Sequence, residues 1–86
     1  MTIESLESIL VSKGVPPIYY SFSSDGFGEV YRIQYMKDIL GDGWEVYYSE
    51  RGNKNRLIIF RSESEACEYF LKWILGDTTL QKHLKA

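Results

Sequence analysis

The stretch of residues 43–76 most constrains what this chain can fold into. Its first segment, Trp44–Glu50, alternates apolar and polar side chains with the two-residue period of a half-buried strand. A polar turn, Arg51–Asn55, follows, and the apolar run Leu57–Phe60 predicts a strand that returns antiparallel. A helix signal begins at Ser62, so the stretch predicts a β-hairpin that leads directly into a helix.

Two amphipathic helices are predicted, one near each end of the chain. The first covers residues 2–13, with Thr2 as its N-cap and Gly14 as the residue that ends it. The second begins at Ser62-x-x-Glu65, the pattern of a capping box, and ends at Gly76. Apolar residues recur every three or four positions in both segments, so each helix has one face to bury.

The middle of the chain predicts two further strands. Residues 18–22 are rich in β-formers, and residues 29–35 alternate. We interpret residues 36–43 as a connection with room for one helical turn. Short connections favour an antiparallel meander. The chain is therefore predicted to be a single α+β domain (residues 1–86), a two-layer sandwich of a four-stranded antiparallel sheet flanked by both helices, with residues 77–86 as a frayed or short helical tail.

Composition narrows the classes of protein that fit. A hydrophobic content of 44% with 15% aromatic residues predicts a folded chain. The formal net charge of −2 argues against nucleic acid as a partner. No apolar run approaches the roughly 20 residues of a membrane span. The single cysteine excludes an internal disulfide, and residues 1–5 lack the positive start of a signal peptide, so we expect a cytoplasmic location.

No residue pattern predicts catalysis, a cofactor or a metal ion, so we expect no enzyme. Paired carboxylates serve as acid and base in glycosidases at separations of about 5–10 Å, but 86 residues leave little depth for such a cleft. Structural roles are favoured instead. Glu63 and Glu65 suit a helix N-terminus, Glu68 a solvent-facing helix side, and Glu45 a cross-strand pair with a base such as Arg32.

Two further features have ordinary explanations. Asp25–Val30 has two of the glycines of a phosphate-binding loop, but a β-turn explains them better because no helix follows. Cys67 lies beside the apolar stripe of the second helix, which favours a buried thiol. Its place near the helix N-terminus favours a lowered thiol pKa instead, although the one histidine, His83, lies in the tail.

Tyr47 is harder to explain by the fold alone. The alternation that buries Trp44 and Val46 turns Tyr47 to the other face of the sheet. An exposed tyrosine flanked by Glu45, with charged residues at the strand end, has the composition of a protein-binding surface. Cross-strand packing on a solvated sheet face explains the same residue equally well.

These residues also carry a resemblance to a family. The pattern resembles small bacterial immunity proteins of polymorphic-toxin and contact-dependent growth inhibition systems. It spans roughly residues 15–75 and comprises Trp44-Glu45-Val46-Tyr47-Tyr48-Ser49-Glu50-Arg51-Gly52, Phe60, Ser62-Glu63 and Glu65-Ala66-Cys67-Glu68-Tyr69-Phe70-Leu71. The resemblance implies a protein that binds a cognate toxin domain in the cytoplasm and blocks it. Many such toxins are basic nucleases, which an acidic surface would attract.

The expected interface combines the outward strand face, the strand end and the acidic start of the second helix. It comprises Glu45, Tyr47, Glu50, Arg51, Glu63, Glu65 and Glu68. We expect a monomer or weak homodimer that binds neither nucleic acid nor membrane. The alternative is a small cytoplasmic adaptor or regulatory module that self-associates through its open sheet face or an edge strand.

Overall fold

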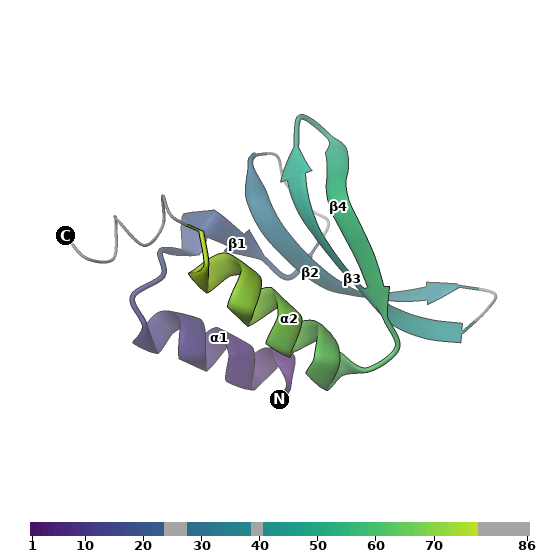
Figure 1. Ribbon diagram of the computed structural model, residues 1–86, viewed down its shortest axis with the longest axis horizontal. Coiled ribbons are helices and arrows are strands. Elements are labelled where there is room, and N and C mark those ends of the chain that lie inside the picture. Colours follow the sequence, from purple (N-terminus) through teal and green to yellow (C-terminus); the bar gives the residue numbers. More distant parts are fainter. Residues whose placement is uncertain (24–27, 39–40, 78–86) are drawn as a thin grey trace.

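Figure 1 shows the computed structural model, which describes residues 1–23, 28–38 and 41–77. Its elements, in chain order, are α1 (Ile3–Ser12), the short 3-10 helix η1 (Pro17–Tyr19), β1 (Tyr20–Ser21), β2 (Val30–Asp38), β3 (Gly41–Glu50), β4 (Asn53–Phe60) and α2 (Glu63–Leu75). The predicted order α-β-β-β-β-α is confirmed. Residues 24–27, where the predicted glycine turn begins, and 78–86, most of the predicted tail, lie outside the described residues.

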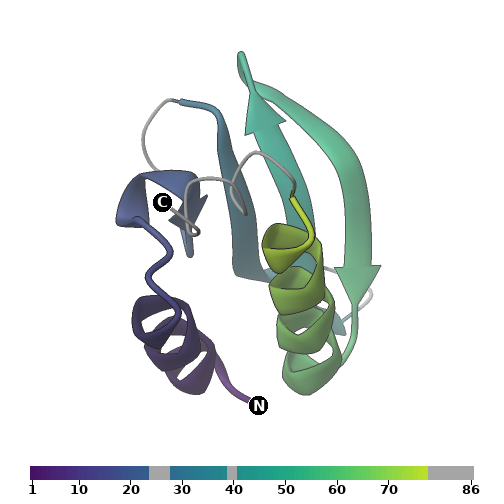
Figure 2. The same cartoon turned by 60° about the vertical axis from the view of Figure 1, so that its left-hand side comes forward.

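Both long helices lie against the same face of the sheet, which gives the predicted two-layer sandwich (Figures 1 and 2). The core fills the space between the layers. Its largest fully buried side chains are Phe70, Leu6, Leu10, Ile33, Ile74, Val46 and Cys67. These residues come from α1, β2, β3 and α2, so burial of apolar surface holds the four elements together.

Thr2 and Ser62 are the N-caps of the two helices, as predicted, but the reciprocal capping box that was predicted at Ser62 is formed at Thr2 instead. Thr2 Oγ1 accepts from the backbone N–H of Ser5 at 3.2 Å, and Ser5 Oγ accepts from the backbone N–H of Thr2 at 2.8 Å. Ser62 Oγ accepts from the backbone N–H of Glu65 at 3.3 Å. Gly14 follows α1 with a φ of 77°, a conformation that glycine adopts without strain.

The sheet has the strand order β1-β2-β3-β4, and its first pair differs from the prediction. Residues 18–22 do not form one strand. The 3-10 helix η1 begins at Pro17, and only Tyr20 and Ser21 adopt the extended conformation of strand β1. β1 then pairs parallel with β2, through Tyr20 with Tyr31 and Ser21 with Arg32. Parallel strands need a returning connection.

The predicted connection at residues 36–43 is also wrong. β2 continues to Asp38 and β3 begins at Gly41, so residues 36–38 and 41–43 belong to the paired strands at the far end of an antiparallel hairpin, and residues 39–40 lie outside the described residues. That end projects beyond the N-terminal end of α2 (Figure 1). The glycines reflect crowding as well as turning: a Cβ atom at Gly43 would lie 3.2 Å from the carbonyl oxygen of Phe60 on β4.

The predicted five-residue turn between the last two strands contains only two turn residues, Arg51 and Gly52. Both have positive φ, 50° and 81°, as a tight type I′ hairpin turn requires. Further along β4, the pairing shifts by one residue, so that Arg56 and Leu57 together lie opposite Tyr47. This β-bulge gives Arg56 a φ of 57° and redirects its side chain.

Candidate functional site

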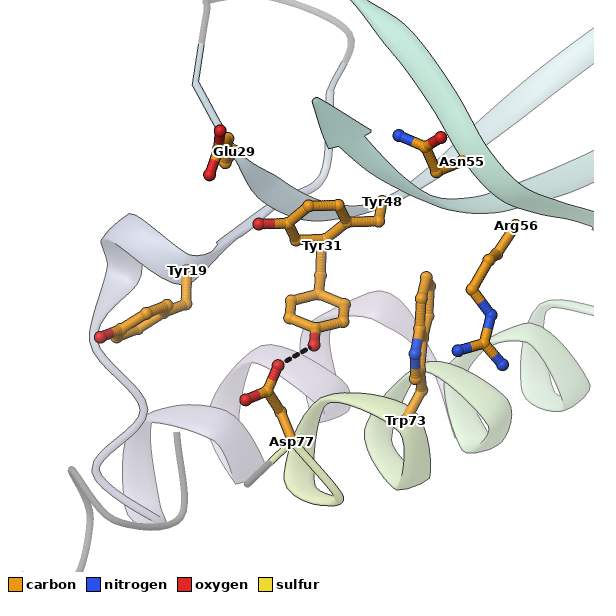
Figure 3. A pocket seen from close by; sticks show the side chains of 8 residues that line it. All are labelled: Tyr19, Glu29, Tyr31, Tyr48, Asn55, Arg56, Trp73 and Asp77. Carbon is orange, nitrogen blue, oxygen red and sulfur yellow. Dashed lines mark hydrogen bonds between the residues drawn. The ribbon is translucent and has the colours of Figure 1, made fainter. Parts of the chain in front are cut away.

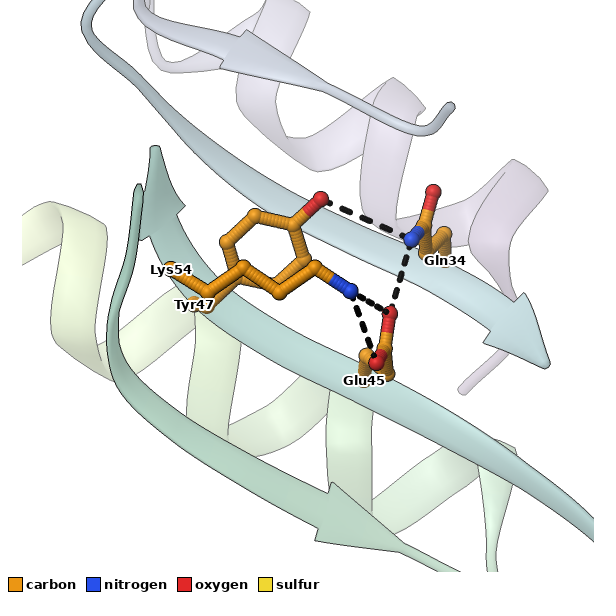
Figure 4. Close-up of polar contacts among 4 residues, drawn as sticks. All are labelled: Gln34, Glu45, Tyr47 and Lys54. Carbon is orange, nitrogen blue, oxygen red and sulfur yellow. Dashed lines mark hydrogen bonds and ion pairs between the residues drawn. The ribbon is translucent and has the colours of Figure 1, made fainter. Parts of the chain in front are cut away.

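The face of the sheet away from the helices carries a compact polar cluster, formed by Gln34, Glu45, Tyr47 and Lys54 (Figure 4). Glu45 accepts from Gln34 Nε2 at 2.8 Å and from Lys54 Nζ at 3.1 Å through each carboxylate oxygen. The Lys54 ammonium also lies 5.0 Å from the centre of the Tyr47 ring, a cation–π contact. The three strands β2, β3 and β4 each contribute to this cluster.

The cluster corrects two expectations. Tyr47 does lie on the face opposite the helices, but only 3% of it is exposed, so it is not the outward tyrosine that the alternation predicted. The base that pairs with Glu45 is Lys54 and not Arg32. Arg32 is buried beside the other edge of the sheet, where its guanidinium donates to the carbonyl oxygen of Ser23 and to Ser21 Oγ. Each charged group therefore already has an internal partner.

The acidic residues of α2 have two different roles. Glu63 Oε2 accepts from the backbone N–H of Ile3 at 2.9 Å, which ties the start of α1 to the start of α2. A charged oxygen there also suits the positive end of the helix dipole. Glu65 and Glu68 are exposed. Exposure was predicted for Glu68, whereas Glu65 was assigned to the helix N-terminus, where its backbone N–H donates to Ser62 Oγ. Of the three glutamates of α2, only Glu65 and Glu68 are therefore exposed enough to contact a partner.

The remaining two predicted residues, Glu50 and Arg51, are exposed at the tip of the β3–β4 hairpin. This tip and the start of α2 lie at opposite ends of β4 (Figure 1). The seven predicted interface residues thus fall into three separate groups: a closed cluster, a hairpin tip and a helix start. The structure does not bring them together as one patch.

The sequence reasoning missed the most apolar surface among the described strands. β4 pairs only with β3, so its other side is a sheet edge. Leu57, Ile58 and Ile59 on this strand are 42%, 37% and 48% exposed. An edge strand with apolar side chains and unpaired backbone groups favours pairing with another chain. The signal was present as an apolar run in the last strand, but sequence alone assigns no strand to an edge.

A cavity of about 500 Å³ opens on the helix side of the sheet, near the end of α2 (Figure 3). Its lining residues are Tyr19, Glu29, Tyr31, Tyr48, Asn55, Arg56, Trp73 and Asp77. The bulge in β4 places Arg56 here, with its guanidinium carbon 5.5 Å from the centre of the Trp73 ring. The Tyr31 hydroxyl donates to Asp77 Oδ2 across the cavity floor.

The aromatic rings of the cavity pack edge to face. The centre of the Tyr31 ring lies 5.1 Å from the centre of the Tyr48 ring and 4.8 Å from that of Trp73, and the interplanar angles are 73° and 87°. Burial and then the nearby carboxylates of Glu29, Glu50 and Asp77 raise the pKa of Tyr48. Burial and the hydrogen bond to Asp77 raise the pKa of Tyr31. Both phenols are therefore hydroxyl groups at neutral pH, in a negative local field.

Nothing in the described residues assembles a nucleophile. Cys67 is fully buried, and burial, followed by the charge of Glu63, raises its thiol pKa to about 11. The helix N-terminus was expected to lower the thiol pKa, but burial raises it by more. Across residues 1–23, 28–38 and 41–77, no group of His, Cys, Asp and Glu side chains is arranged to hold a metal ion.

Comparison with known proteins gives no match to a protein-family model, a curated protein or a solved structure. Within the described part of the chain, no helix is long and apolar enough to cross a membrane. Among the described residues, four surface features remain as candidates for function: the β4 edge, the hairpin tip, the exposed acidic side of α2 and the aromatic cavity.

Proposed function

We propose that this protein is an immunity protein that binds a cognate bacterial toxin domain and blocks it by protein–protein contact. The observation that carries the proposal is the exposed apolar edge of β4, Leu57–Ile59, which the isolated chain leaves in water. Burying such side chains against a partner is favourable by about 25 cal/mol per Å² of apolar area. The resemblance of the surrounding sequence to immunity proteins supplies the kind of partner.

The proposed interface is centred on the edge strand β4, whereas the sequence predicted an interface on the outward face of residues 44–50. It consists of the β4 edge, with Glu50 and Arg51 at one end of the strand and Glu65 and Glu68 near the other. An apolar centre with a charged rim is the usual anatomy of a protein interface. Glu45, Tyr47 and Glu63 are already engaged within the fold, so we assign them supporting roles.

Charge favours a basic partner. The chain has a formal net charge of −2. Local charge at the proposed interface is mixed, with Glu50, Glu65 and Glu68 near the ends of β4 and Arg51, Lys54 and Arg56 at its start, so the preference for a basic partner comes from the net charge of the chain. Complementary charge mainly accelerates association, and its effect falls as salt screens it. A basic nuclease domain fits this surface, and it would be held away from its phosphate-rich substrate while bound.

Co-expression tests the proposal directly. Each candidate toxin domain found among the genes next to this one is expressed in a sensitive bacterium with and without the protein, and growth is measured. Rescue of growth and a co-purifying complex are expected. Continued killing in the presence of folded, soluble protein would overturn the immunity function.

A matched pair of variants tests the interface. Leu57→Lys with Ile59→Lys places two charges on the exposed edge, and Ile18→Lys, which adds one charge at a residue on η1 that is 75% exposed, controls for an added lysine away from the edge. The edge variant should weaken toxin binding at least about tenfold by calorimetry, because a lysine is costly to bury at an interface centre. The Ile18 variant should bind like the wild type. Equal affinity for all three proteins would exclude the β4 edge.

The same edge favours a second function, a small adaptor that self-associates. Two copies pairing along β4 would bury Leu57–Ile59 and continue the sheet across the dimer. Light scattering at protein concentrations from about 10 to 500 µM, a range that spans weak dimer affinities, distinguishes the two functions. A dimer that the edge variant abolishes, together with no rescue from any neighbouring toxin, would support the adaptor.

A further inference from the structure

The β-bulge in β4 holds Arg56 in an unusual conformation. Its φ of 57° lies in the left-handed region, which residues other than glycine and asparagine rarely adopt. Arg51 also has a positive φ, but there the tight hairpin turn requires it. At Arg56 the bulge instead turns the side chain towards α2, where the guanidinium carbon lies 5.5 Å from the centre of the Trp73 ring. The backbone strain therefore has a local result, the placement of one cation over one indole.

Trp73 gives this cation a firm support. The centre of its ring lies 4.8 Å from that of Tyr31 and 5.9 Å from that of Tyr69. In Figure 3 the indole lies between the Arg56 guanidinium and the hydrogen bond from Tyr31 to Asp77. An arginine that lies over a ring keeps the N–H groups at its edge for other acceptors. The guanidinium is therefore held in place before any partner arrives.

The charge of Arg56 has no anionic partner in the described part of the chain. Two neighbouring cations are engaged: Lys54 donates to Glu45, and Arg61 donates to the backbone carbonyl of Asp42. Across residues 1–23, 28–38 and 41–77, Arg56 makes no ion pair and no hydrogen bond, and its contact with the indole supplies only ring electrons. The forked N–H groups of Arg56 are therefore available to an acceptor from another molecule.

Arg56 also borders the apolar part of the proposed interface. The residues that follow it, Leu57–Phe60, form an unbroken apolar run, which is typical of a strand buried on both faces. β4 is nevertheless an edge strand, and Leu57, Ile58 and Ile59 are exposed. A partner that covers this run meets Arg56 at the point where the apolar surface ends.

We propose that Arg56 binds a carboxylate on the surface of the protein partner, at the border of the apolar contact made by Leu57–Ile59. The planar guanidinium matches a carboxylate through two parallel N–H···O bonds, which fix the orientation of the partner as well as adding affinity. Arginine and tryptophan are also among the residues that carry most of the binding energy at protein interfaces. A partner with a positive net charge has carboxylates too, so this contact is compatible with a basic toxin domain. The inference rests on the proposed function, because it assigns the chemistry of one contact within the same interface.

Three variants, measured against the toxin domain by calorimetry, test the contact. Arg56→Asn removes the guanidinium but keeps a residue that tolerates a positive φ, and it should weaken binding at least about tenfold. Arg56→Lys keeps the charge without the planar fork, so its affinity should fall between those of Arg56→Asn and the wild type. Lys37→Asn removes the same charge from an exposed residue of β2 that lies outside the proposed interface, and it should bind like the wild type.

A double-mutant cycle identifies the carboxylate. Aspartates and glutamates on the surface of the toxin domain are changed one at a time to asparagine or glutamine, and each is measured against the wild-type and Arg56→Asn proteins. One of these changes should weaken binding to the wild type about tenfold and have little further effect on Arg56→Asn. A merely structural role of Arg56 would weaken binding without coupling to any single carboxylate.

Thermal melts establish that each variant is folded, and Arg56→Gly, which relieves the positive φ, replaces Arg56→Asn if that variant unfolds. The contact is wrong, and the β4 interface stands, if the folded variant binds as tightly as the wild type or if no carboxylate couples to Arg56. A defect in Lys37→Asn as large as that in Arg56→Asn would also overturn the contact, because net charge alone would explain both. If the wild type binds no toxin domain at all, the proposed function fails and the contact fails with it.

Discussion

Charge reversal at two glutamates of the same strand should have very different consequences. Glu45→Lys and Glu50→Lys change the net charge equally, and both positions lie on β3. Glu45 is 7% exposed and holds Gln34 and Lys54, whereas Glu50 is exposed at the hairpin tip. Glu45→Lys should therefore destabilise the fold, and Glu50→Lys should leave its stability almost unchanged.

The magnitude follows from what surrounds Glu45. Removing one member of a buried ion pair costs about 3–5 kcal/mol, but the side chain of Lys54 is 46% exposed and can turn towards water. A lysine at position 45 adds repulsion against that ammonium, so we expect a loss of about 2–4 kcal/mol. A chain of 86 residues has about 4–13 kcal/mol of total stability. Glu45→Lys should thus lower the melting temperature by at least about 10 °C.

Urea unfolding, followed by circular dichroism and tryptophan fluorescence, measures both free energies. Glu50→Lys should differ from the wild type by less than about 0.5 kcal/mol, as surface substitutions usually do. Glu45→Gln and Lys54→Met, singly and together, form a double-mutant cycle. Their coupling energy should exceed the value of about 0.2–1 kcal/mol that is typical of exposed pairs, because the carboxylate is shielded from water.

A free energy of unfolding for Glu45→Lys within about 0.5 kcal/mol of the wild-type value would refute this prediction. That result would mean that Glu45 is available at the surface, as the strand alternation first indicated. A toxin-binding defect in a Glu45→Lys protein of unchanged stability would return Glu45 to the interface. If stability and binding fall together, Glu45 supports the fold, and the binding defect is indirect.

Two further predictions follow from the buried contacts of α2. Glu63→Ala should cost about 1–2 kcal/mol of stability more than Glu65→Ala in urea unfolding, because both lie near the helix N-terminus but only Glu63 binds the backbone N–H of Ile3. Equal losses would show that this bond contributes nothing. Burial raises the thiol pKa of Cys67 from its ordinary value of 9.0 to about 11 in the folded protein. As pH rises, the Cys67 thiol therefore loses its proton in the unfolded chain before it does in the folded one, and the free energy of unfolding should fall by about 2 kcal/mol from pH 9 to pH 11. Cys67→Ala should flatten this slope between pH 9 and 10, and an unchanged slope would contradict the assignment.

Local signals in the sequence were sufficient for most of the elements. The capping residues Thr2 and Ser62 and the stop residues Gly14 and Gly76 lie where the helices begin and end. These signals work because caps and stops depend on hydrogen bonds within a few residues. Alternation likewise identified residues 44–50 of β3 and the side of the sheet to which each of them turns.

The sequence did not predict features that depend on contacts between residues far apart in the chain. Polar composition made residues 36–43 resemble a connection, although pairing between β2 and β3 keeps most of them in strands. The parallel pairing of Tyr20 with Tyr31 depends on how the chain returns after β1, which no local pattern encodes. Alternation assigned Tyr47 to the correct face but not its burial, because burial depends on Lys54, seven residues away on the next strand.

The burial of Tyr47 changes where a partner should bind. A polar face that satisfies its own charges offers a partner little, since each contact would have to replace an internal bond of similar strength. An apolar edge offers more, because Leu57, Ile58 and Ile59 give up contact with water and no internal bond is lost. The lysine and arginine at positions 54 and 56 place charge only on the first half of β4, and the β-bulge separates that half from the apolar second half. The second half of the strand is therefore where binding gains the most free energy at the least cost to the fold.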